Sequence, residues 1–455
     1  MQTIFAQRAR LPQGWAENLR LTISEGRISS LETGAEPQAG DTRADVLLPS
    51  LGNLHSHSFQ RAMAGMTEYR AAGKDSFWTW RELMYRFMDR ITPEQYEAIA
   101  ALVFMEMLEA GYASVGEFHY VHHQPGGVHF TSVTELSERV FAAAGQTGIG
   151  LTHLPVLYTY GGAGKQELSG GQQRFGNSVA EFNELVSRAR EFAARELPSD
   201  ACVGIAPHSL RATCPEDLAE VLQIQNGLPV HIHISEQPKE VADINAWLGA
   251  RPVEWLLDNA AVDGKWCLIH ATHMTSSETA GMARSGAVAG LCPITEANLG
   301  DGPFNGVEYL AEKGAFGVGS DSNVRISLPE ELRTLEYSQR LRDFARNVLV
   351  PGEGSVGETL YLGAAKGGAQ ALGRDAGRIE EGALADLVAI DSGVPALCAL
   401  KPEQLLDGLC FAAGDDTVTD VWSAGRHVVN QGRHIARDSV VAGYKTAIKE
   451  LLNSL

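Results

Sequence analysis

Apolar segments of strand length recur along the middle of the chain, and polar stretches with helical spacing separate them. They occupy residues 48–57, 113–120, 149–158, 202–209, 229–236, 266–273, 287–295 and 314–322. Such alternation is typical of a parallel sheet with helices outside it, and eight β/α units predict a closed (β/α)8 barrel of the TIM type. A doubly wound sheet is the alternative, but no G-x-G-x-x-G pattern follows the first segment to support it.

Three of the intervening helices carry capping-box signals, in which Ser or Thr precedes Glu or Gln by three positions. The signals begin at Thr92, Ser132 and Ser178. Pro93 follows the first of them, where proline suits the first position of a helix. We therefore expect helices to begin directly after these three residues.

The two ends of the chain show another pattern, in which short β-like runs are separated by glycine. LTISEGRISSLETG lies near the N-terminus with a turn expected at Glu25-Gly26, and GRIEEGALADLVAID and VTDVWSAGRHVVNQGRHIA lie near the C-terminus. We predict that residues 1–47 and 377–440 together form one small β-sandwich domain. The barrel then takes residues 48–376, and residues 441–455 have the spacing of a C-terminal helix.

Composition and charge limit the possible partners. The chain has 455 residues, 44% hydrophobic and 20% charged, as is ordinary for a soluble globular enzyme, and its net charge of -19 repels nucleic acid and anionic membranes. The first 20 residues have no apolar core typical of a secretory signal, and no CxxC pattern occurs. We expect a cytoplasmic protein that binds neither nucleic acid nor a membrane.

Ionisable side chains stand at the ends of five of the eight apolar segments. They are His55, His57, His208, His233, Glu236, His270 and Asp321. The carboxyl ends of the strands meet at one face of a barrel, where functional groups gather. An H-x-H pair alone could arise by chance, but seven such residues at matching positions predict one metal-dependent site.

Three histidines and one carboxylate supply a complete ligand set for one divalent metal. The set is His55, His57, His233 and Asp321. Nitrogen and oxygen ligands in this ratio favour zinc, with iron as the alternative, and a catalytic site keeps one position for water.

Other histidines compete for this role. His231 shares a strand face with His233, so either could be the ligand. Glu236 follows His233 beyond the strand end, where a carboxylate can reach water at the metal. We therefore predict that His233 is the ligand and that His231 is a core residue. Four more histidines are weaker candidates. They are His119, His122, His123 and His153.

The arrangement of these motifs resembles the amidohydrolase superfamily, in its mononuclear deaminase branch. HxH in the first segment, HxxE in the fifth, His in the sixth and SDS in the eighth match its pattern, as does GxIxxGxxADLVxxD from Gly377 to Asp391. The resemblance covers essentially the whole chain, without departure at the ligand positions. It implies a single metal, because the fourth segment, CVGIAPHS, lacks the lysine that bridges two metals in the binuclear branches.

The resemblance also implies a substrate. NLHSHSFQRAMAG, GEFHY, APHSLRA, CPITEANLGDGPF and GSDSNVRISLPEELR are similar to members that hydrolyse N-formimino-L-glutamate to N-formyl-L-glutamate and ammonia in histidine degradation. Asp321 would accept the proton of the attacking water and Glu236 would pass a proton to the departing nitrogen. His270 would orient the nucleophile or stabilise the tetrahedral centre.

A substrate with two carboxylates calls for arginine. Arg211, three residues after His208, and Arg81, in SFWTWRELMYR, are the candidates. Arg81 could equally be a surface helix residue beside a core or an oligomer interface formed by FWTW. The resemblance supports further substrate contacts. They are Gln60, Tyr120 and His208.

Several alternatives stay open. Another aminohydrolase of the same branch would act on formiminoaspartate, guanine or S-adenosylhomocysteine, and a catalytically silent binding protein would keep only the fold. Family analogy suggests a homodimer, in which Arg81 could serve either subunit's site. The glycine-rich residues 161–177 are expected to form an active-site loop, and Arg61 and Arg325 have no assigned role.

Overall fold

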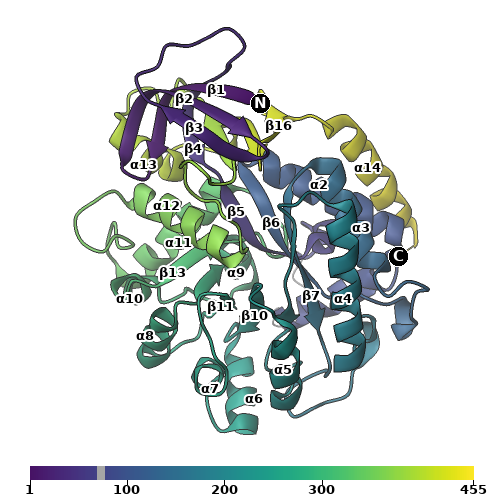
Figure 1. Cartoon of the computed structure of the whole chain (residues 1–455). Coiled ribbons are helices and arrows are strands. Elements are labelled where there is room, and N and C mark those ends of the chain that lie inside the picture. Colours follow the sequence, from purple (N-terminus) through teal and green to yellow (C-terminus); the bar gives the residue numbers. More distant parts are fainter. Residues whose placement is uncertain (69–76, 455) are drawn as a thin grey trace.

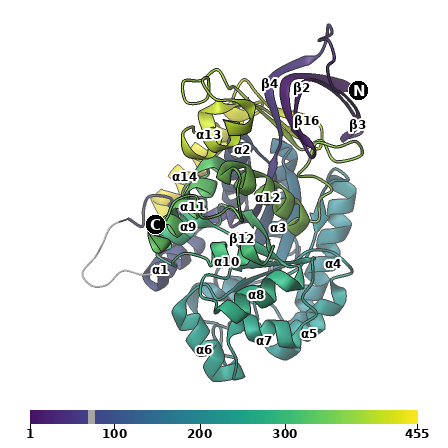
Figure 2. The same cartoon turned by 90° about the vertical axis from the view of Figure 1, so that its left-hand side faces the viewer.

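The computed structural model describes residues 1–68 and 77–454 of the chain. It contains an α/β part and a β domain, which lies at the top of the view in Figure 1. Both termini contribute to the β domain, and Figure 2 shows it from the side, at one end of the α/β part.

Every predicted apolar segment of the α/β part contains a strand. One sheet holds β5 Leu51–Ser56, β6 Tyr112–His119, β7 Gly150–Leu157 and β8 Cys202–Val203, with β9 Ala206–Pro207 paired to β7. The other holds β10 Val230–Ile234, β11 Trp266–His270, β12 Val288–Leu291 and β13 Ala315–Val318. All pairs are parallel and most strand residues are buried, as expected for strands covered on both faces.

Consecutive strands are neighbours in both sheets, so the described residues show no reversal of strand order like that of a doubly wound sheet. Isolated parallel bridges join the sheets at two seams. Ser56 pairs with Asp321 at the first, and Ile205 with Val230 and Ser209 with His233 at the second. The first seam brings the end of β5 beside the end of β13, and the second brings β9 beside β10.

Helices cover the outside of these strands. Their bounds are α1 Phe77–Met88, α2 Pro93–Glu109, α3 Glu135–Thr147, α4 Val179–Glu196, α5 Pro215–Val221, α6 Pro238–Leu248, α7 Pro252–Asn259, α8 Ser276–Ser285, α9 Pro293–Leu299, α10 Gly306–Ala311, α11 Leu328–Asp343, α12 Val356–Ala371, α13 Leu405–Phe411 and α14 Arg437–Ser454. Helix α14 lies against α2. Among the described residues, no helix is both long and apolar enough to cross a membrane.

Two of the three predicted helix starts are confirmed. Thr92 and Ser178 cap α2 and α4 with complete capping boxes. The third prediction was wrong, because α3 begins at Glu135 and Ser132 does not cap it. The Ser132 hydroxyl instead donates to the side chain of Glu138 at 3.1 Å, and the Thr134 hydroxyl donates to the same carboxylate at 2.5 Å.

The β domain is a single eight-stranded sheet. Its strands are β1 Gln2–Leu11, β2 Gly14–Ser24, β3 Arg27–Glu32, β4 Thr42–Pro49, β14 Leu387–Ile390, β15 Val418–Ser423, β16 Arg426–Asn430 and β17 Arg433–His434. The predicted turn is confirmed, since Glu25 and Gly26 have φ of 49° and 77°, the left-handed values of a type I′ hairpin. Both termini contribute, as predicted.

The prediction of a two-sheet sandwich was wrong. Strand β4 from the N-terminal segment pairs antiparallel with β14 from the C-terminal segment, with Pro49 opposite Leu387 and Val46 opposite Ile390. This pairing joins the strands of both termini edge to edge in one continuous hydrogen-bonded sheet.

Candidate active site

The ends of the barrel strands surround one cavity, and the predicted site residues converge there. Those that line it are His57, Gln60, Arg81, Tyr120, His208, Arg211, His233, Glu236, His270 and Asp321. His55 is fully buried and its ring contacts those of His57 and His233. Side chains that lie far apart in the sequence therefore form one site.

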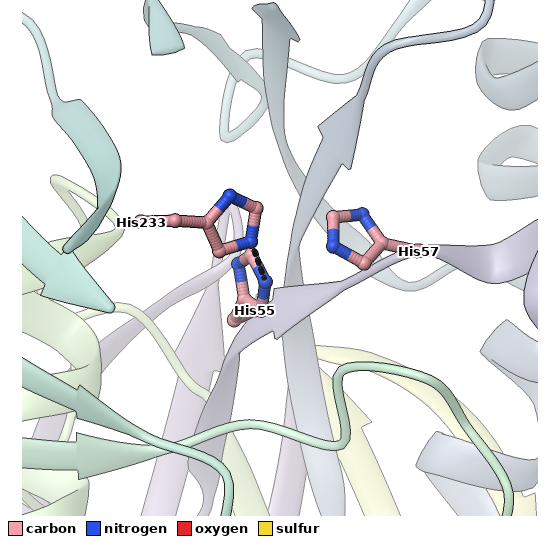
Figure 3. Close-up of side chains that lie close together, drawn as sticks. All are labelled: His55, His57 and His233. Carbon is pink, nitrogen blue, oxygen red and sulfur yellow. Dashed lines mark hydrogen bonds between the residues drawn. The ribbon is translucent and has the colours of Figure 1, made fainter. Parts of the chain in front are cut away.

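The four predicted metal ligands face one another. The Nε2 atoms of His55 and His233 are 3.1 Å apart, and Asp321 Oδ1 lies 3.5 Å from His55 Nε2 and 3.4 Å from His57 Nε2. Figure 3 shows the three imidazole rings pointing toward a common centre. A tetrahedral cation with bonds of ~2.0–2.1 Å places its ligands about 3.3 Å apart, so these residues fit a zinc-sized divalent ion.

The protonation of the rings suits metal binding. The Nδ1 of His57 donates to the Phe118 carbonyl at 2.9 Å, and the Nδ1 of His233 donates to the His208 carbonyl at 3.1 Å. The proton of each neutral ring is therefore on Nδ1, and the Nε2 lone pair is available to a metal. Burial lowers the pKa of His55, His57 and His233, so their rings are neutral. Burial alone would raise the pKa of Asp321, but the nearby imidazoles outweigh it and hold that pKa below its usual range.

Asn323, which sequence reasoning missed, ties the ligands of two strands together. Its Nδ2 donates to Ser56 Oγ at 3.2 Å, to the His57 carbonyl at 3.1 Å and to the Asp321 carbonyl at 3.0 Å. Its Oδ1 accepts from Ser320 Oγ at 2.6 Å. The side chain is fully buried at the seam between β5 and β13, so it fixes His57 relative to Asp321.

Replacing Asn323 by Ala is expected to weaken metal binding about 10- to 100-fold, the usual effect of losing a residue that orients metal ligands. Competition with a chelator, followed by elemental analysis, measures the change. Asn259→Ala is the matched control, since Asn259 is exposed on α7 and donates to the Trp255 carbonyl. Unchanged metal affinity in Asn323→Ala would show that Asn323 does not position the ligands.

Glu236 and His270 lie beside this ligand set. His270 Nδ1 donates to Glu296 Oε1 at 3.2 Å, and its Nε2 lies 3.9 Å from Asp321 Oδ2. Burial opposes the charged ring, but the Glu296 hydrogen bond and the carboxylates of Glu236 and Asp321 outweigh it and raise the pKa of His270 to about 10. Burial raises the pKa of Glu236. The site thus holds a cationic imidazole and a carboxyl group suited to proton transfer.

Arg211 is buried between two carboxylates. Its Nη2 lies 3.6 Å from Glu236 Oε2, and its Nε lies 3.7 Å from Glu240 Oε2. Glu240 also accepts from the backbone N–H groups of Ser235 at 3.2 Å and Glu236 at 3.1 Å. Sequence reasoning missed Glu240, which looked like an ordinary first-turn helix residue, although it links Arg211 to the segment that carries Glu236.

The other predicted contacts share the same cavity. Gln60 Nε2 donates to the Tyr120 hydroxyl at 2.7 Å, and His208 Nδ1 bonds with Ser209 Oγ at 2.9 Å. Arg81 on α1 lies over the Tyr85 ring, 5.5 Å from its centroid, and lines the cavity of its own chain. Four aromatic side chains complete the wall. They are Trp80, Tyr85, Tyr158 and Phe175.

Other residues considered in the sequence analysis have their hydrogen-bond and ion-pair partners outside the candidate metal site. His231 Nε2 donates to the Ala371 carbonyl at 2.8 Å, which confirms it as a core residue. Arg61 donates to the carbonyls of Asn323 and Val324, while Arg325 pairs with Glu330 and Asp415, so both have structural partners. The weaker histidine candidates join no metal-ligating group found among the described residues. They are His119, His122, His123 and His153.

The segment around Arg81 is partly described. Ser76 and the side chains of residues 77–79 lie outside the part of the chain that the structure describes, so the expectation of a core or interface role for FWTW is addressed only from Trp80, which lines the cavity. Within residues 161–177, Phe175 also lines it, as expected of an active-site loop. Arg174 of the same segment is buried and donates to the carbonyls of His123 and Met88.

Parallel strands with three histidines and an aspartate gathered at their ends define a metal-dependent hydrolase. Residues 46–428 match the family model described as "Amidohydrolase family", and residues 1–45 match "Formimidoylglutamate deiminase HutF, N-terminal domain". The chain therefore belongs to the amidohydrolase family. Its fold is of the TIM-barrel type found in that family, with an extra domain.

Individual relatives agree with this assignment. The chain is 49% identical over 459 residues to the formimidoylglutamate deiminase of Pseudomonas aeruginosa, with 100% of both chains covered. An amidohydrolase from Brucella melitensis has a TM-score of 0.95 at 49% identity, covering 99% of this chain and 100% of that one. An adenosine deaminase from Xanthomonas campestris with bound zinc has a TM-score of 0.82 at 22% identity, covering 99% and 98%.

Proposed function

We propose that this chain is a metal-dependent deiminase of histidine degradation, which hydrolyses N-formimino-L-glutamate to N-formyl-L-glutamate and ammonia. The observation that carries the proposal is the single cavity in which a metal-ligating set meets two arginines, Arg211 and Arg81. The full-length similarity to a formimidoylglutamate deiminase supports the same substrate. Glu236 and His270 between these features match the chemistry of an amidine substrate.

The chain's residues have separate tasks in this reaction. His55, His57, His233 and Asp321 would hold one divalent cation, zinc or alternatively iron, which when bound would lower the pKa of a water molecule toward neutrality and polarise the imino group. Asp321 takes the proton from the attacking water. The water oxygen becomes the carbonyl oxygen of the formyl group, and the carbon–nitrogen bond to the departing amino group breaks.

Proton delivery and charge stabilisation fall to the neighbouring groups. Glu236 carries a proton to the departing nitrogen, which leaves as ammonia. His270, placed by Glu296, donates a hydrogen bond to the tetrahedral centre. Glu236 and Asp321 also favour the protonated formimino group as a cation.

Arginine binds the two carboxylates of the substrate. Arg211 is the main anchor and Arg81 the second, because planar guanidinium groups bind carboxylates in a bidentate manner. Gln60, Tyr120 and His208 donate further hydrogen bonds from the same wall. An anionic substrate enters a chain of net charge -19 only because these local cations offset the repulsion.

We also propose finer features of the architecture. The bridges at the two seams complete a closed (β/α)8 barrel over residues 48–376, with a β domain from residues 1–47 and 377–440 and a C-terminal helix from residues 441–455. Family analogy suggests a homodimer in the cytoplasm. The net charge of -19 supports a protein that binds neither nucleic acid nor a membrane.

A second candidate is a deaminase of the same branch that acts on guanine or S-adenosylhomocysteine. The aromatic wall of the cavity favours it, because rings stack on purine bases. Formiminoaspartate is a third possible substrate, since the length of the acid chain is set by the distance between the arginines and the reacting groups.

An ammonia-release assay on this panel of substrates tests the proposal. With one equivalent of zinc we expect N-formimino-L-glutamate to be preferred over N-formimino-L-aspartate by roughly 10- to 200-fold in kcat/KM. This is the usual discrimination between substrates that differ by one methylene group. A chelator should abolish the activity and added zinc should restore it. Ammonia from guanine or a nucleoside, with none from either formimino acid, would overturn the assignment.

A further inference from the structure

We infer that His270, Cys292 and Glu296 form a second metal site, distinct from the catalytic ligand set, and that a zinc or cadmium ion bound there lowers turnover. One ligand atom from each of these side chains lies within 4.8 Å of the other two, and all three side chains are buried. The effect on turnover rests on the proposed function, whereas the metal binding itself does not.

The fold places these residues at the ends of two adjacent strands and in the helix that follows the second. His270 ends β11, Cys292 follows β12, and Glu296 lies one turn into α9, which Cys292 precedes. Glu296 Oε1 accepts from the Cys292 backbone N–H at 2.8 Å and from His270 Nδ1 at 3.2 Å. The nitrogen and oxygen thus already stand at about the 3.3 Å separation that a tetrahedral ion requires, and the sulfur needs a shift of roughly 1 Å at most.

The donor set decides which ions bind. Imidazole, thiolate and carboxylate together are ligands of zinc, and the sulfur favours softer ions such as cadmium. The catalytic set has no sulfur, so the two sites differ in preference. Binding releases two protons, one from the Cys292 thiol and one from His270 Nδ1. One dication replaces them, so the net charge of the buried cluster does not change.

A separate cavity borders this cluster on the side of Glu296. It has a volume of about 530 Å³, lies between α9 and α11, and is lined by Glu296 together with Pro293, Ser338 and Arg342. The cavity that holds the catalytic ligands is lined by His270 but not by Glu296. Glu296 therefore borders a second cavity, apart from the one that holds the catalytic ligand set.

Metal binding changes how His270 is held. Its Nδ1 atom donates to Glu296 Oε1 at 3.2 Å, and an ion on Nδ1 replaces that hydrogen bond. The ring then leaves the position from which Nε2 donates a hydrogen bond to the tetrahedral centre. We expect kcat to fall at least tenfold, while the ligand set formed by His55, His57, His233 and Asp321 keeps its own ion.

Cadmium titration of protein that already carries one zinc per chain tests the site. The exposed Cys398 is first replaced by Ser, which removes a competing thiol. We expect one cadmium to bind with the ultraviolet charge-transfer band of a cadmium thiolate, with the zinc retained by elemental analysis. In the same background, Cys292→Ala and Cys292→Ser should lose the band. Cys410→Ala is the matched control, a buried cysteine on α13, and should keep it.

Turnover is compared within each variant, as the ratio of rates with and without the second ion. In the background and in Cys410→Ala, the rate with the second ion should be at least tenfold lower than the rate without it. In both Cys292 variants the two rates should be nearly equal. Absence of the thiolate band, its persistence in the Cys292 variants, or equal inhibition of all variants would overturn the inference. If another substrate proves correct, the band still reports binding, so the two proposals fail separately.

Discussion

Glu236→Gln is expected to lower kcat about 10²- to 10⁴-fold while leaving the metal content unchanged. Glutamine keeps the size of the side chain but cannot carry a proton to the departing nitrogen. Glu236 is buried beside Arg211 and is not among the metal-ligating groups, so the catalytic ion should stay bound. Steady-state ammonia release and elemental analysis measure the two effects.

The control for this variant is Glu254→Gln, since Glu254 is exposed on α7 and does not line the cavity. It should keep normal rates. A nearly active Glu236→Gln enzyme would refute the proton-transfer role, and loss of metal would mean that Glu236 supports the ligand set instead.

Arg211→Met is expected to lower kcat/KM about 10²- to 10³-fold, mainly by raising KM. The guanidinium binds a carboxylate that does not change during the reaction, so its contribution is similar in the ground state and the transition state. Metal content should be unaffected. Steady-state kinetics with N-formimino-L-glutamate separate the two parameters.

Two further variants make this test specific. Arg211→Lys keeps the positive charge but loses bidentate binding, so its kcat/KM should lie between those of the wild type and Arg211→Met. Arg284→Met is the surface control, because Arg284 is exposed on α8 and pairs only with Glu312 among the described residues. Unchanged kinetics in Arg211→Met would remove Arg211 from the carboxylate site.

The residues at strand ends were predictable because strand geometry is local. His55 and His57 share a face in any strand, and parallel β/α units bring the ends of all strands to one side. The eight apolar segments therefore indicated where the candidate catalytic groups lie. Asp321 joined His55 and His57 by the same rule, and the observed 3.4–3.5 Å separations agree with it.

The supporting residues were not predictable in this way. Asn323 and Glu240 act through hydrogen bonds to backbone groups, and such bonds leave no periodic pattern in the sequence. Glu296 looked like an ordinary helical residue until its contact with His270 was visible. The continuous β sheet was missed for a similar reason, since the pairing of β4 with β14 joins segments far apart in the chain.

The sequence by itself determined the strand-and-helix alternation and indicated the candidate metal ligands and the acid beside them, because these depend on residue type and local spacing. Only the tertiary structure decided which side chains hold those groups in place and how the terminal strands pair. It also set Arg211 between two carboxylates, Arg81 in its own cavity and Cys292 beside His270. Those features depend on distances between segments remote in sequence, which no local pattern records.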